Sequence, residues 1–167
     1  MVLLLNGKLK NKLSAHKEGL AHYAYSIFIF NSGGELLLQK RAKDKYHSGG
    51  LWTNTCCSHP LSSSLLDIKY SAEQRLYYEM GIGATLSYAF NFRYKELCGI
   101  FVENELDYVF VGYSDKKPVI NLNEVEEYKW INLKDAVEDR RKNADRYTKW
   151  FNLILDRYIT ELSLYVK

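Results

Sequence analysis

Apolar and aromatic residues predict strands in the first third of the chain. Residues 23–30, with the sequence YAYSIFIF, are rich in aromatic and β-branched side chains, which favour a strand. Residues 31–34, NSGG, have the composition of a turn, and residues 36–40 predict a return strand. Together these segments predict a β-hairpin, which a polar, glycine-containing loop follows over residues 43–50.

A helical period follows in the centre of the chain. Apolar residues recur every three or four positions, and Gly81 stands where such a helix is expected to end. The pattern therefore predicts a helix over residues 65–80. The residues that carry it are Leu65, Ile68, Ala72, Leu76 and Met80.

The remainder of the chain predicts more strands and a final helical region. Asn132 is expected to cap a helix that has Asp135 in its first turn. This helical stretch is expected to break near Asn143 and to resume over residues 150–162. The predicted strands are residues 86–94, 100–113 and 125–131.

The order of these elements predicts the fold class. No repeat, low-complexity run or Pro/Gly-rich linker divides the 167 residues, so a single domain over residues 1–167 is expected. Strands that alternate with a central and a C-terminal helix predict an α/β (α+β) sandwich around a mixed sheet. Since 47% of the residues are hydrophobic, such a domain can bury a core without disulfides.

Charge and cysteine content narrow the classes of function. The net charge of +3 gives no reason to expect a nucleic-acid partner. Three cysteines, an odd number with two of them adjacent, suggest no disulfide framework and favour a reducing compartment. No stretch approaches the ~20 apolar residues of a membrane span, and the first residues lack the basic start of a signal peptide. A cytoplasmic protein that binds no membrane is expected.

Cys57-Ser58-His59 is the first candidate for chemistry. In an extended segment, residues two apart point to the same side, so Cys57 and His59 would face one cavity. The alternative is a buried thiol beside an ordinary core histidine. Taken alone, the pair favours this alternative.

Two carboxylates lie close together within the predicted strand 100–113. Glu103 and Glu105 share one face with Asp107, and apolar residues flank them. Neighbouring carboxylates repel each other unless a cation or a proton lies between them. The alternative, a face that is simply exposed to water, is equally compatible with this pattern.

The histidines complete a possible metal site. His16 and His22 can meet only if the chain turns at Gly19. Three imidazoles and two carboxylates suit a divalent transition metal such as Zn, Mn or Fe, although spacing alone does not bring dispersed residues together. The fourth histidine, His47, has no assigned role. The candidate ligands are His16, His22, His59, Glu103 and Glu105.

Basic residues gather in the loop after the first two strands. This loop has either a solvated surface or the charges of a diphosphate clamp, because guanidinium and ammonium groups both bind phosphate oxygens. The residues are Lys40, Arg41, Lys43 and Lys45, with Lys12 and Lys17 near the amino end.

The end of the predicted helix resembles the signature helix of the Nudix superfamily. That helix carries several glutamates that bind Mg²⁺ for diphosphate hydrolysis, and here only Glu79 matches one of them. Gln74, Arg75 and Tyr78 replace the expected residues. One carboxylate can hold a Mg²⁺ ion that phosphate already bridges, but it is not expected to assemble a multi-metal hydrolytic site.

Several motifs together resemble the type 1 isopentenyl-diphosphate Δ-isomerases, a branch of the Nudix fold. The segment LWTNTCCSHP over residues 51–60 is similar to the family's W-T-N-x-x-C-x-H-P motif, and residues 92–94 and 102–105 also match. Residues 37–42 and Lys45 fit the same pattern. The resemblance extends from about Lys12 to Trp150 and implies a Nudix-like α/β/α sandwich.

This resemblance implies a role for each matching residue. Cys57 and Glu105 match the catalytic residues, with Tyr94 beside them, and the five His and Glu residues match the ligands of one Mn or Zn ion. Glu79 matches a contact to Mg²⁺ that arrives with the diphosphate. The matching substrate-binding residues are Lys12, Arg41, Lys45, Ser58 and Trp150. The expected partner is a small isoprenoid diphosphate, and the expected state is a monomer.

The chain also departs from the family pattern. The interval from His16 to His22 is one residue shorter than in some relatives, and Ser48 stands where a proline is common. Cys56 lies next to Cys57, but the interval to His59 favours Cys57 as the catalytic residue.

The implied reaction moves a double bond by adding a proton at one carbon and removing one from another. We expect Glu105 with Tyr94 to protonate the alkene and the Cys57 thiolate to take the second proton from the opposite face. Trp52 and Trp150 are candidates to stabilise the carbocation between the two steps. Two alternatives are a Nudix pyrophosphohydrolase acting on a nucleotide-type diphosphate and a non-catalytic, metal-stabilised binding module.

Overall fold

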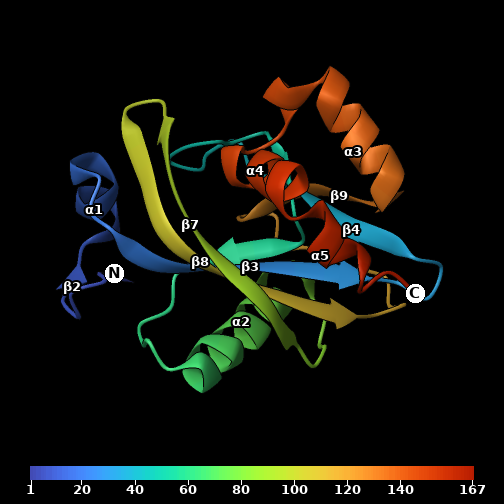
Figure 1. Ribbon diagram of the computed structural model, residues 1–167, viewed down its shortest axis with the longest axis horizontal. Helices are drawn as coiled ribbons and strands as arrows, with labels where there is room; N and C mark the ends of the chain where they lie inside the picture. The colour runs from blue at the N-terminus through green and yellow to red at the C-terminus, as the bar shows by residue number, and fades with distance from the viewer.

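The computed structural model describes all 167 residues and has a mixed, seven-stranded sheet at its centre (Figure 1). Its two central strands, β3 (His22–Phe30) and β8 (Phe101–Tyr113), run parallel, whereas the other pairs are antiparallel. A separate two-stranded sheet lies near the amino end. The remaining strands are β1 (Val2–Leu3), β2 (Leu9–Lys10), β4 (Glu35–Arg41), β5 (Trp52–Thr53), β6 (Cys56–Ser58), β7 (Ser87–Cys98) and β9 (Val125–Asn132).

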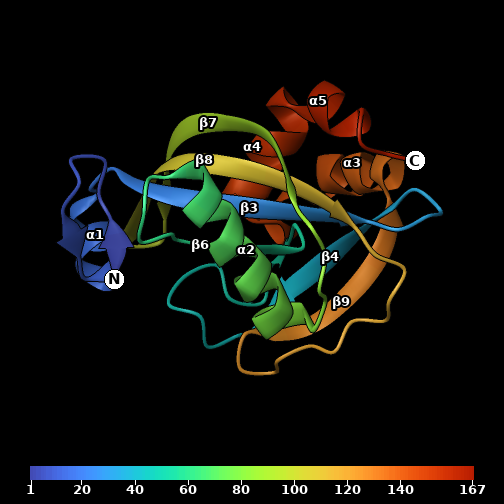
Figure 2. The same cartoon turned by 90° about the horizontal axis from the view of Figure 1, so that it is seen from below.

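Helices cover both faces of the sheet, as the predicted α/β/α sandwich requires. Helix α2 (Leu65–Met80) lies on one face, and the C-terminal helices lie on the other (Figures 1 and 2). These helices are α3 (Leu133–Lys142), α4 (Lys149–Arg157) and α5 (Ile159–Ser163), with the 3₁₀ turn Ala144–Arg146 between the first two. None of the helices has the length and apolar character that a membrane crossing demands.

Strand β3 divides the core because its side chains alternate between the two faces. Tyr25, Ile27 and Ile29 pack with helix α2, while Phe28 and Phe30 pack with helix α4. Polar residues replace the apolar ones on the α4 side toward the start of β3. The core therefore gives way there to a cavity that polar side chains line.

The predicted hairpin is only partly correct. The turn forms, since Asn31 N donates to Glu35 O at 2.9 Å, but β3 and β4 pair only at Phe30 and Leu36. Beyond that point β6 pairs with β3, and β9 pairs with β4 along most of its length. The composition of residues 23–40 fixes the turn, whereas distant segments decide which strands become neighbours.

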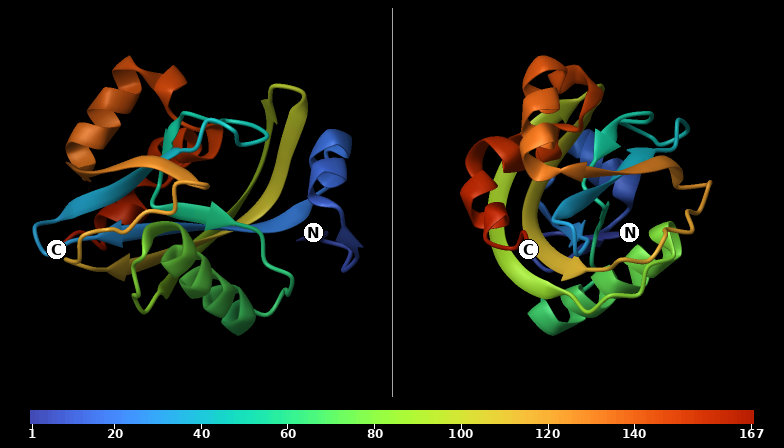
Figure 3. Two further views of the ribbon diagram at one scale, coloured as in Figure 1. Left: turned by 180° about the vertical axis from the view of Figure 1, so that it is seen from behind. Right: turned by 90° about the vertical axis from the view of Figure 1, so that its right-hand side faces the viewer.

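Two further differences lie close to the functional region. Strand β7 continues to Cys98, past the predicted end at residue 94, and forms with β8 a long hairpin that bends toward helix α1 (Figure 3). Helix α1 (Lys12–Glu18) was not expected from the sequence. Its seven residues are too few to be stable alone, so its packing against β8 has to hold it in place.

The predicted helix ends are confirmed. The Asn132 side chain accepts a hydrogen bond from Lys134 N, and Gly81 ends helix α2 in the left-handed region with φ 66°. A β-carbon at Gly81 would lie 2.7 Å from Val119 O. Gly81 is therefore required both by its backbone conformation and by the close approach of the segment around Val119.

Replacing Gly81 by alanine is expected to lower the free energy of unfolding by about 2 kcal/mol, because alanine is strained at positive φ and would collide with backbone. Urea denaturation followed by circular dichroism measures this loss. Gly83→Ala is the matched control, since a β-carbon there meets nothing within 4 Å. Equal stabilities of the two variants would contradict the role assigned to Gly81.

Candidate metal centre and catalytic cavity

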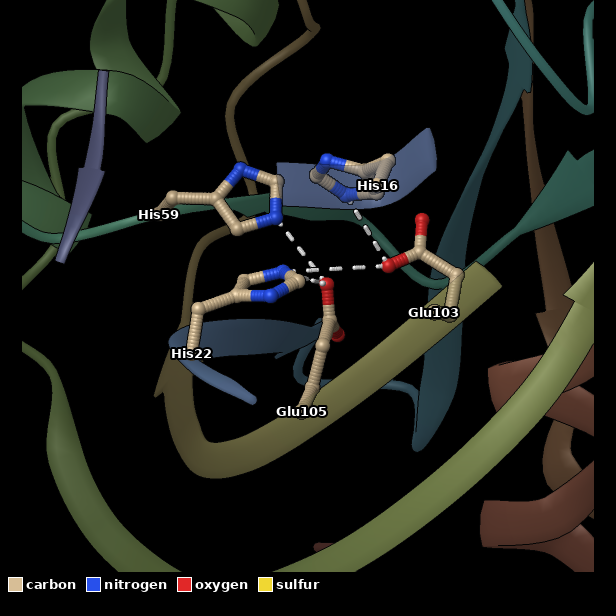
Figure 4. A group of neighbouring side chains, drawn as sticks. All are labelled: His16, His22, His59, Glu103 and Glu105. Carbon is tan, nitrogen blue, oxygen red and sulfur yellow. Dashed lines mark hydrogen bonds and ion pairs between the residues drawn. The ribbon is translucent and has the colours of Figure 1, made fainter. Parts of the chain in front are cut away.

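The five candidate metal ligands come together at one end of the sheet (Figure 4). His16 comes from α1, His22 begins β3, His59 follows β6, and Glu103 and Glu105 lie on β8. One ligand atom from each residue lies within 4.8 Å of the corresponding atom of every other residue. This group has the donor atoms and the spacing to hold a metal ion.

The turn at Gly19 brings the first two histidines together. Gly19 ends helix α1 with φ 64°, and the chain reverses there, so the His16 and His22 rings lie 4.7 Å apart between centroids. Asn11 caps the start of the same helix by accepting a hydrogen bond from Ser14 N. The short helix thus carries His16 into the site although its sequence alone predicts no helix.

The hydrogen bonds of two imidazoles leave their second nitrogens facing carboxylates. His16 Nδ1 and His22 Nδ1 lie 2.6 and 2.7 Å from the backbone oxygens of Lys12 and Leu20, so Nδ1 carries the proton in the neutral rings. Nε2 of His16 is 3.2 Å from Glu103 Oε2, and Nε2 of His22 is 3.3 Å from Glu105 Oε1. Lone pairs therefore face lone pairs, and a cation between them resolves the repulsion.

The two carboxylates differ in pKa because their neighbours differ. Burial and the neighbouring Glu105 raise the pKa of Glu103 to about 7. Burial opposes ionisation of Glu105 as well, but the contacts with the His22 and His59 imidazoles hold its pKa well below the usual range. Burial lowers the pKa of His59 to about 3, which leaves that imidazole neutral. A neutral His59 beside an ionised Glu105 has the ligand forms that a divalent metal needs.

Cys57 opens into a cavity beside these ligands. The cavity is lined by Cys57, Ser58, His59, Glu103 and Glu105 together with basic and aromatic residues. Cys57 and His59 face it together, as the alternation along an extended segment predicts. Burial raises the pKa of Cys57 to about 12, although the Arg41 guanidinium acts in the opposite direction. The expected thiolate is therefore not the resting form of this side chain, which is a thiol.

Tyr94 lies against Glu105, as expected for a residue near the acid/base pair. Its hydroxyl donates to Glu105 Oε2 at 2.7 Å, and only 5% of the residue is exposed. Burial and Glu105 raise the pKa of Tyr94 well above its usual value, so the hydroxyl keeps its proton. The two oxygens of Glu105 are thereby divided: Oε1 faces His22 and His59, and Oε2 faces Tyr94.

Basic side chains line the other end of the cavity. Lys12, Arg41 and Lys45 all reach it, as predicted, and Arg75 joins them. Lys45 and Arg75 pair with Glu124, whereas Lys12 and Arg41 form no ion pair with a carboxylate. Burial lowers the pKa of Lys12 because it disfavours the charged amine, and repulsion from Arg41 lowers this pKa further. An anion at this end would relieve that repulsion.

Glu79 does not belong to the His/Glu group. It is buried on helix α2, where its oxygens contact Arg75 at 2.7 Å, Gln39 at 2.9 Å and the Cys56 thiol at 3.4 Å. The other glutamate of the helix, Glu73, accepts a hydrogen bond from Leu86 N. One carboxylate of α2 therefore lies beside the basic end of the cavity, and no second one accompanies it.

The two tryptophans proposed to face a carbocation differ in position. Trp150 lines the cavity, and its Nε1 donates to Asn54 Oδ1 at 3.2 Å, which fixes the ring. Trp52 does not line it; instead Lys129 Nζ lies 4.2 Å from the centroid of its ring. The ring of Trp52 packs against the hydrophobic core that contains Phe151, which is a packing position and not a place on the cavity wall.

Three residues around the cavity were missed by the sequence interpretation. Arg75 appeared only as a departure from a Nudix motif. Asp107 lies on the same strand face as Glu105 and accepts a hydrogen bond from Ser26 Oγ at 2.7 Å. His47 is buried and contacts Glu103. The alternation along β8 was a signal for Asp107, whereas a loop residue such as His47 gives no periodic signal.

Comparison with known proteins gives close relatives over most of the chain. The NUDIX domain family matches residues 20–151. "Isopentenyl-diphosphate Delta-isomerase 2" of Aromatoleum aromaticum is 44% identical over 154 residues, which cover 92% of this chain and 80% of that protein. The protein of the same description from Photorhabdus laumondii is also 44% identical, over 87% of this chain and 81% of its own length.

Two solved structures share the fold. A MutT protein from Methanosarcina mazei has a TM-score of 0.69 at 18% identity, and covers 85% of this chain and 95% of its own. The Deinococcus radiodurans protein DR0079 has the same TM-score at 13% identity, with 90% and 89% covered. The TM-scores establish a common architecture, and at such low identity the chemistry has to be argued from the site.

Proposed function

Because this chain belongs to the isopentenyl-diphosphate Delta-isomerase family of NUDIX-domain proteins, we propose that it converts isopentenyl diphosphate to dimethylallyl diphosphate with Cys57 and Glu105 as its acid/base pair. The observation that carries this proposal is one cavity that three kinds of side chain line. The Cys57 thiol, the Glu105 carboxylate, basic side chains and the Trp150 ring all line it.

The reaction needs one proton added and one removed. Because the resting pair is a thiol and a carboxylate, the Cys57 proton first has to pass to Glu105. Glu105, whose Oε2 accepts the Tyr94 hydroxyl, then delivers this proton to the terminal CH₂ of the alkene, which becomes a methyl group and leaves a tertiary carbocation. Cys57 removes a proton from the CH₂ next to the cationic carbon, and the released electron pair forms the new double bond. Arg41 Nη1, 3.9 Å from Cys57 Sγ, favours the thiolate that this step requires.

The cavity protects the carbocation in two ways. Trp150 presents an aromatic ring, whose electron-rich face stabilises positive charge. Asn54 holds this ring, and the neighbouring Phe151 and Ile154 are fully buried, so the element that carries it is firmly packed. Substrate that fills the cavity would displace water, which could otherwise capture the cation and divert it to an alcohol.

The metal centre would position Glu105 and set its protonation equilibrium. The donor set of His16, His22, His59, Glu103 and Glu105 fits one Mn or Zn ion, and the buried Glu103 Oε2 has no hydrogen-bond donor of its own. When bound, such an ion supplies positive charge that fixes the orientation and the protonation equilibrium of Glu105. The backbone oxygens of Lys12 and Leu20 orient His16 and His22 for binding this ion.

The basic end of the cavity would hold the diphosphate. Lys12, Arg41, Lys45 and Ser58 supply donors there, and Glu79 would contact a Mg²⁺ ion that accompanies the diphosphate. Arg41 contacts both Cys57 and Trp150, since its Cζ lies 5.2 Å from the Trp150 ring centroid. The residue that holds phosphate therefore also touches the residues that act on the hydrocarbon.

Replacing Lys12 by methionine is expected to raise KM about 10-fold or more and to change kcat little, because a charge-assisted hydrogen bond to phosphate contributes about 1.5–3 kcal/mol. Steady-state kinetics with isopentenyl diphosphate measures both constants. Lys17→Met is the matched control, since Lys17 lies exposed on the same helix. A KM that is unchanged, or raised equally in both variants, would remove Lys12 from the diphosphate site.

The same geometry argues against a pyrophosphohydrolase. Hydrolysis by several metal ions needs several carboxylates on helix α2, and Glu79 alone lies beside the cavity there. A binding module without catalysis would leave the thiol and the Tyr94–Glu105 pair in one cavity unexplained.

The decisive experiment incubates the metal-loaded protein with isopentenyl diphosphate in deuterated water. Dimethylallyl diphosphate with deuterium in a methyl group is the expected product, detected by NMR and mass spectrometry. Release of phosphate would favour the hydrolase instead. No isomerised product from the protein loaded with Mn²⁺ or Zn²⁺ and supplied with Mg²⁺ would overturn the proposed function.

A further inference from the structure

His47 is a buried histidine that the ligand group leaves out. It lies in the loop between β4 and β5, and it is 8% exposed although neighbouring loop residues are more open. Its ring forms part of the wall between the catalytic cavity and an open hollow beside the β7–β8 hairpin. A polar ring in such a place needs a hydrogen-bond partner.

Nε2 of His47 forms no hydrogen bond of standard geometry, and the carboxylate that it contacts belongs to a ligand of the metal centre. Nε2 of His47 contacts Glu103 Oε1, while Glu103 Oε2 lies 3.2 Å from His16 Nε2 within the ligand group (Figure 4). Oε1 of Glu103 therefore faces His47 outside the ligand group, and Oε2 faces His16 within it. A carboxylate held by one oxygen has its other oxygen fixed in direction.

Ser48 contacts the other ring nitrogen of His47. Its Oγ lies 3.0 Å from His47 Nδ1, and a hydroxyl that donates to Nδ1 leaves the proton on Nε2, which faces Glu103. Ser48 is the only residue other than glycine with positive φ, at 53°. Since this conformation costs an L-residue roughly 1–2 kcal/mol, the contact is maintained against backbone strain.

The rest of the loop is anchored to the catalytic cavity. Arg41 Nη2 donates to the backbone oxygen of His47 at 3.3 Å, and the His47 ring packs edge-on against Trp150 with centroids 6.0 Å apart. Lys45, two residues earlier, lines the basic end of the cavity. One loop therefore contacts the metal centre, the aromatic wall and the diphosphate end.

We propose that His47 is a positioning residue that donates Nε2–H to Glu103 Oε1, aims Oε2 at the metal ion, and thereby links metal binding to the order of the loop over residues 42–50. This inference rests on the metal site proposed above. Because such coupling is reciprocal, the ion stabilises the loop by the same factor by which the loop strengthens binding of the ion.

The test compares His47→Gln with His47→Leu, two side chains of similar size of which only glutamine can donate a hydrogen bond. Mn²⁺ alone is titrated into the metal-free full chain, with the free ion counted by electron paramagnetic resonance. Leucine is expected to weaken Mn²⁺ binding about 10- to 100-fold, and glutamine to restore most of it. Hydrogen exchange of residues 42–50 should slow on Mn²⁺ binding in the wild type and in the glutamine variant, but not in the leucine variant.

Each result decides the proposal. Equal Mn²⁺ affinities of the wild type and the leucine variant would overturn it while leaving the metal site intact. Failure of the wild type to bind Mn²⁺, with His16→Ala indistinguishable from it, would remove the metal site and the inference together. A leucine variant that loses affinity without recovery in the glutamine variant would show a packing role and would also overturn it.

Discussion

Replacing Cys57 by alanine is expected to lower kcat for isomerisation by about 10³-fold or more, since a positioned acid/base group contributes about 10²- to 10⁴-fold. The product measured is dimethylallyl diphosphate formed from isopentenyl diphosphate. The fold should survive, because Cys57 is partly exposed at the cavity wall and alanine leaves no unpaired polar group there. Mn²⁺ affinity should change little, because the thiol is not one of the five ligands.

The adjacent cysteine supplies the matched control. Cys56 points to the opposite side of β6, is fully buried, and packs in the core under helix α2. Cys56→Ala is expected to cost stability while retaining most of the turnover per folded molecule. The opposite outcome, in which Cys56→Ala is inactive and Cys57→Ala is active, would contradict the assignment of Cys57. A Cys57→Ala protein with full activity would remove Cys57 from the proposed acid/base pair.

Alternation along a strand explains why some site residues could be predicted. Residues two apart in an extended segment share a face whatever the strand pairs with, so Cys57 with His59 and Glu103 with Glu105 were expected to point together. The structure places both pairs at one cavity. The alternative of a water-exposed face for the glutamates is wrong, since Glu103 and Glu105 are 2% and 5% exposed.

Contacts between distant segments explain what could not be predicted. The composition of residues 31–34 predicts the turn, but the insertion of β6 beside β3 depends on pairing between Tyr25 and Ser58, far apart in sequence. Helix α1 needs the β7–β8 hairpin to pack on, and His47 is buried only because Glu103 and Trp150 surround it. Local patterns carry no information on such partners. The approach of His16 to His22 was conditional on a turn at Gly19, and the structure has that turn.

Glu105→Gln is expected to abolish isomerisation, with a loss in kcat of about 10³-fold or more that excess metal does not restore. Glu105 has two roles in the proposed site, since Oε1 lies among the ligands and Oε2 accepts the Tyr94 hydrogen bond. Glutamine keeps the shape and removes both the charge and the exchangeable acid. The assay measures turnover of isopentenyl diphosphate over a series of Mn²⁺ concentrations, with bound metal counted at each concentration.

Glu103→Gln separates the two roles, because Glu103 is a candidate ligand of the same centre that makes no contact with Tyr94. Its loss of activity should follow its loss of bound metal, and saturating Mn²⁺ should return turnover to within about 10-fold of wild type. The distinction rests on comparing the variants at equal metal occupancy. If Glu105→Gln regained activity once loaded, Glu105 would be a ligand only. If Glu103→Gln stayed inactive when loaded, the proton would have to be assigned to a site that both carboxylates share.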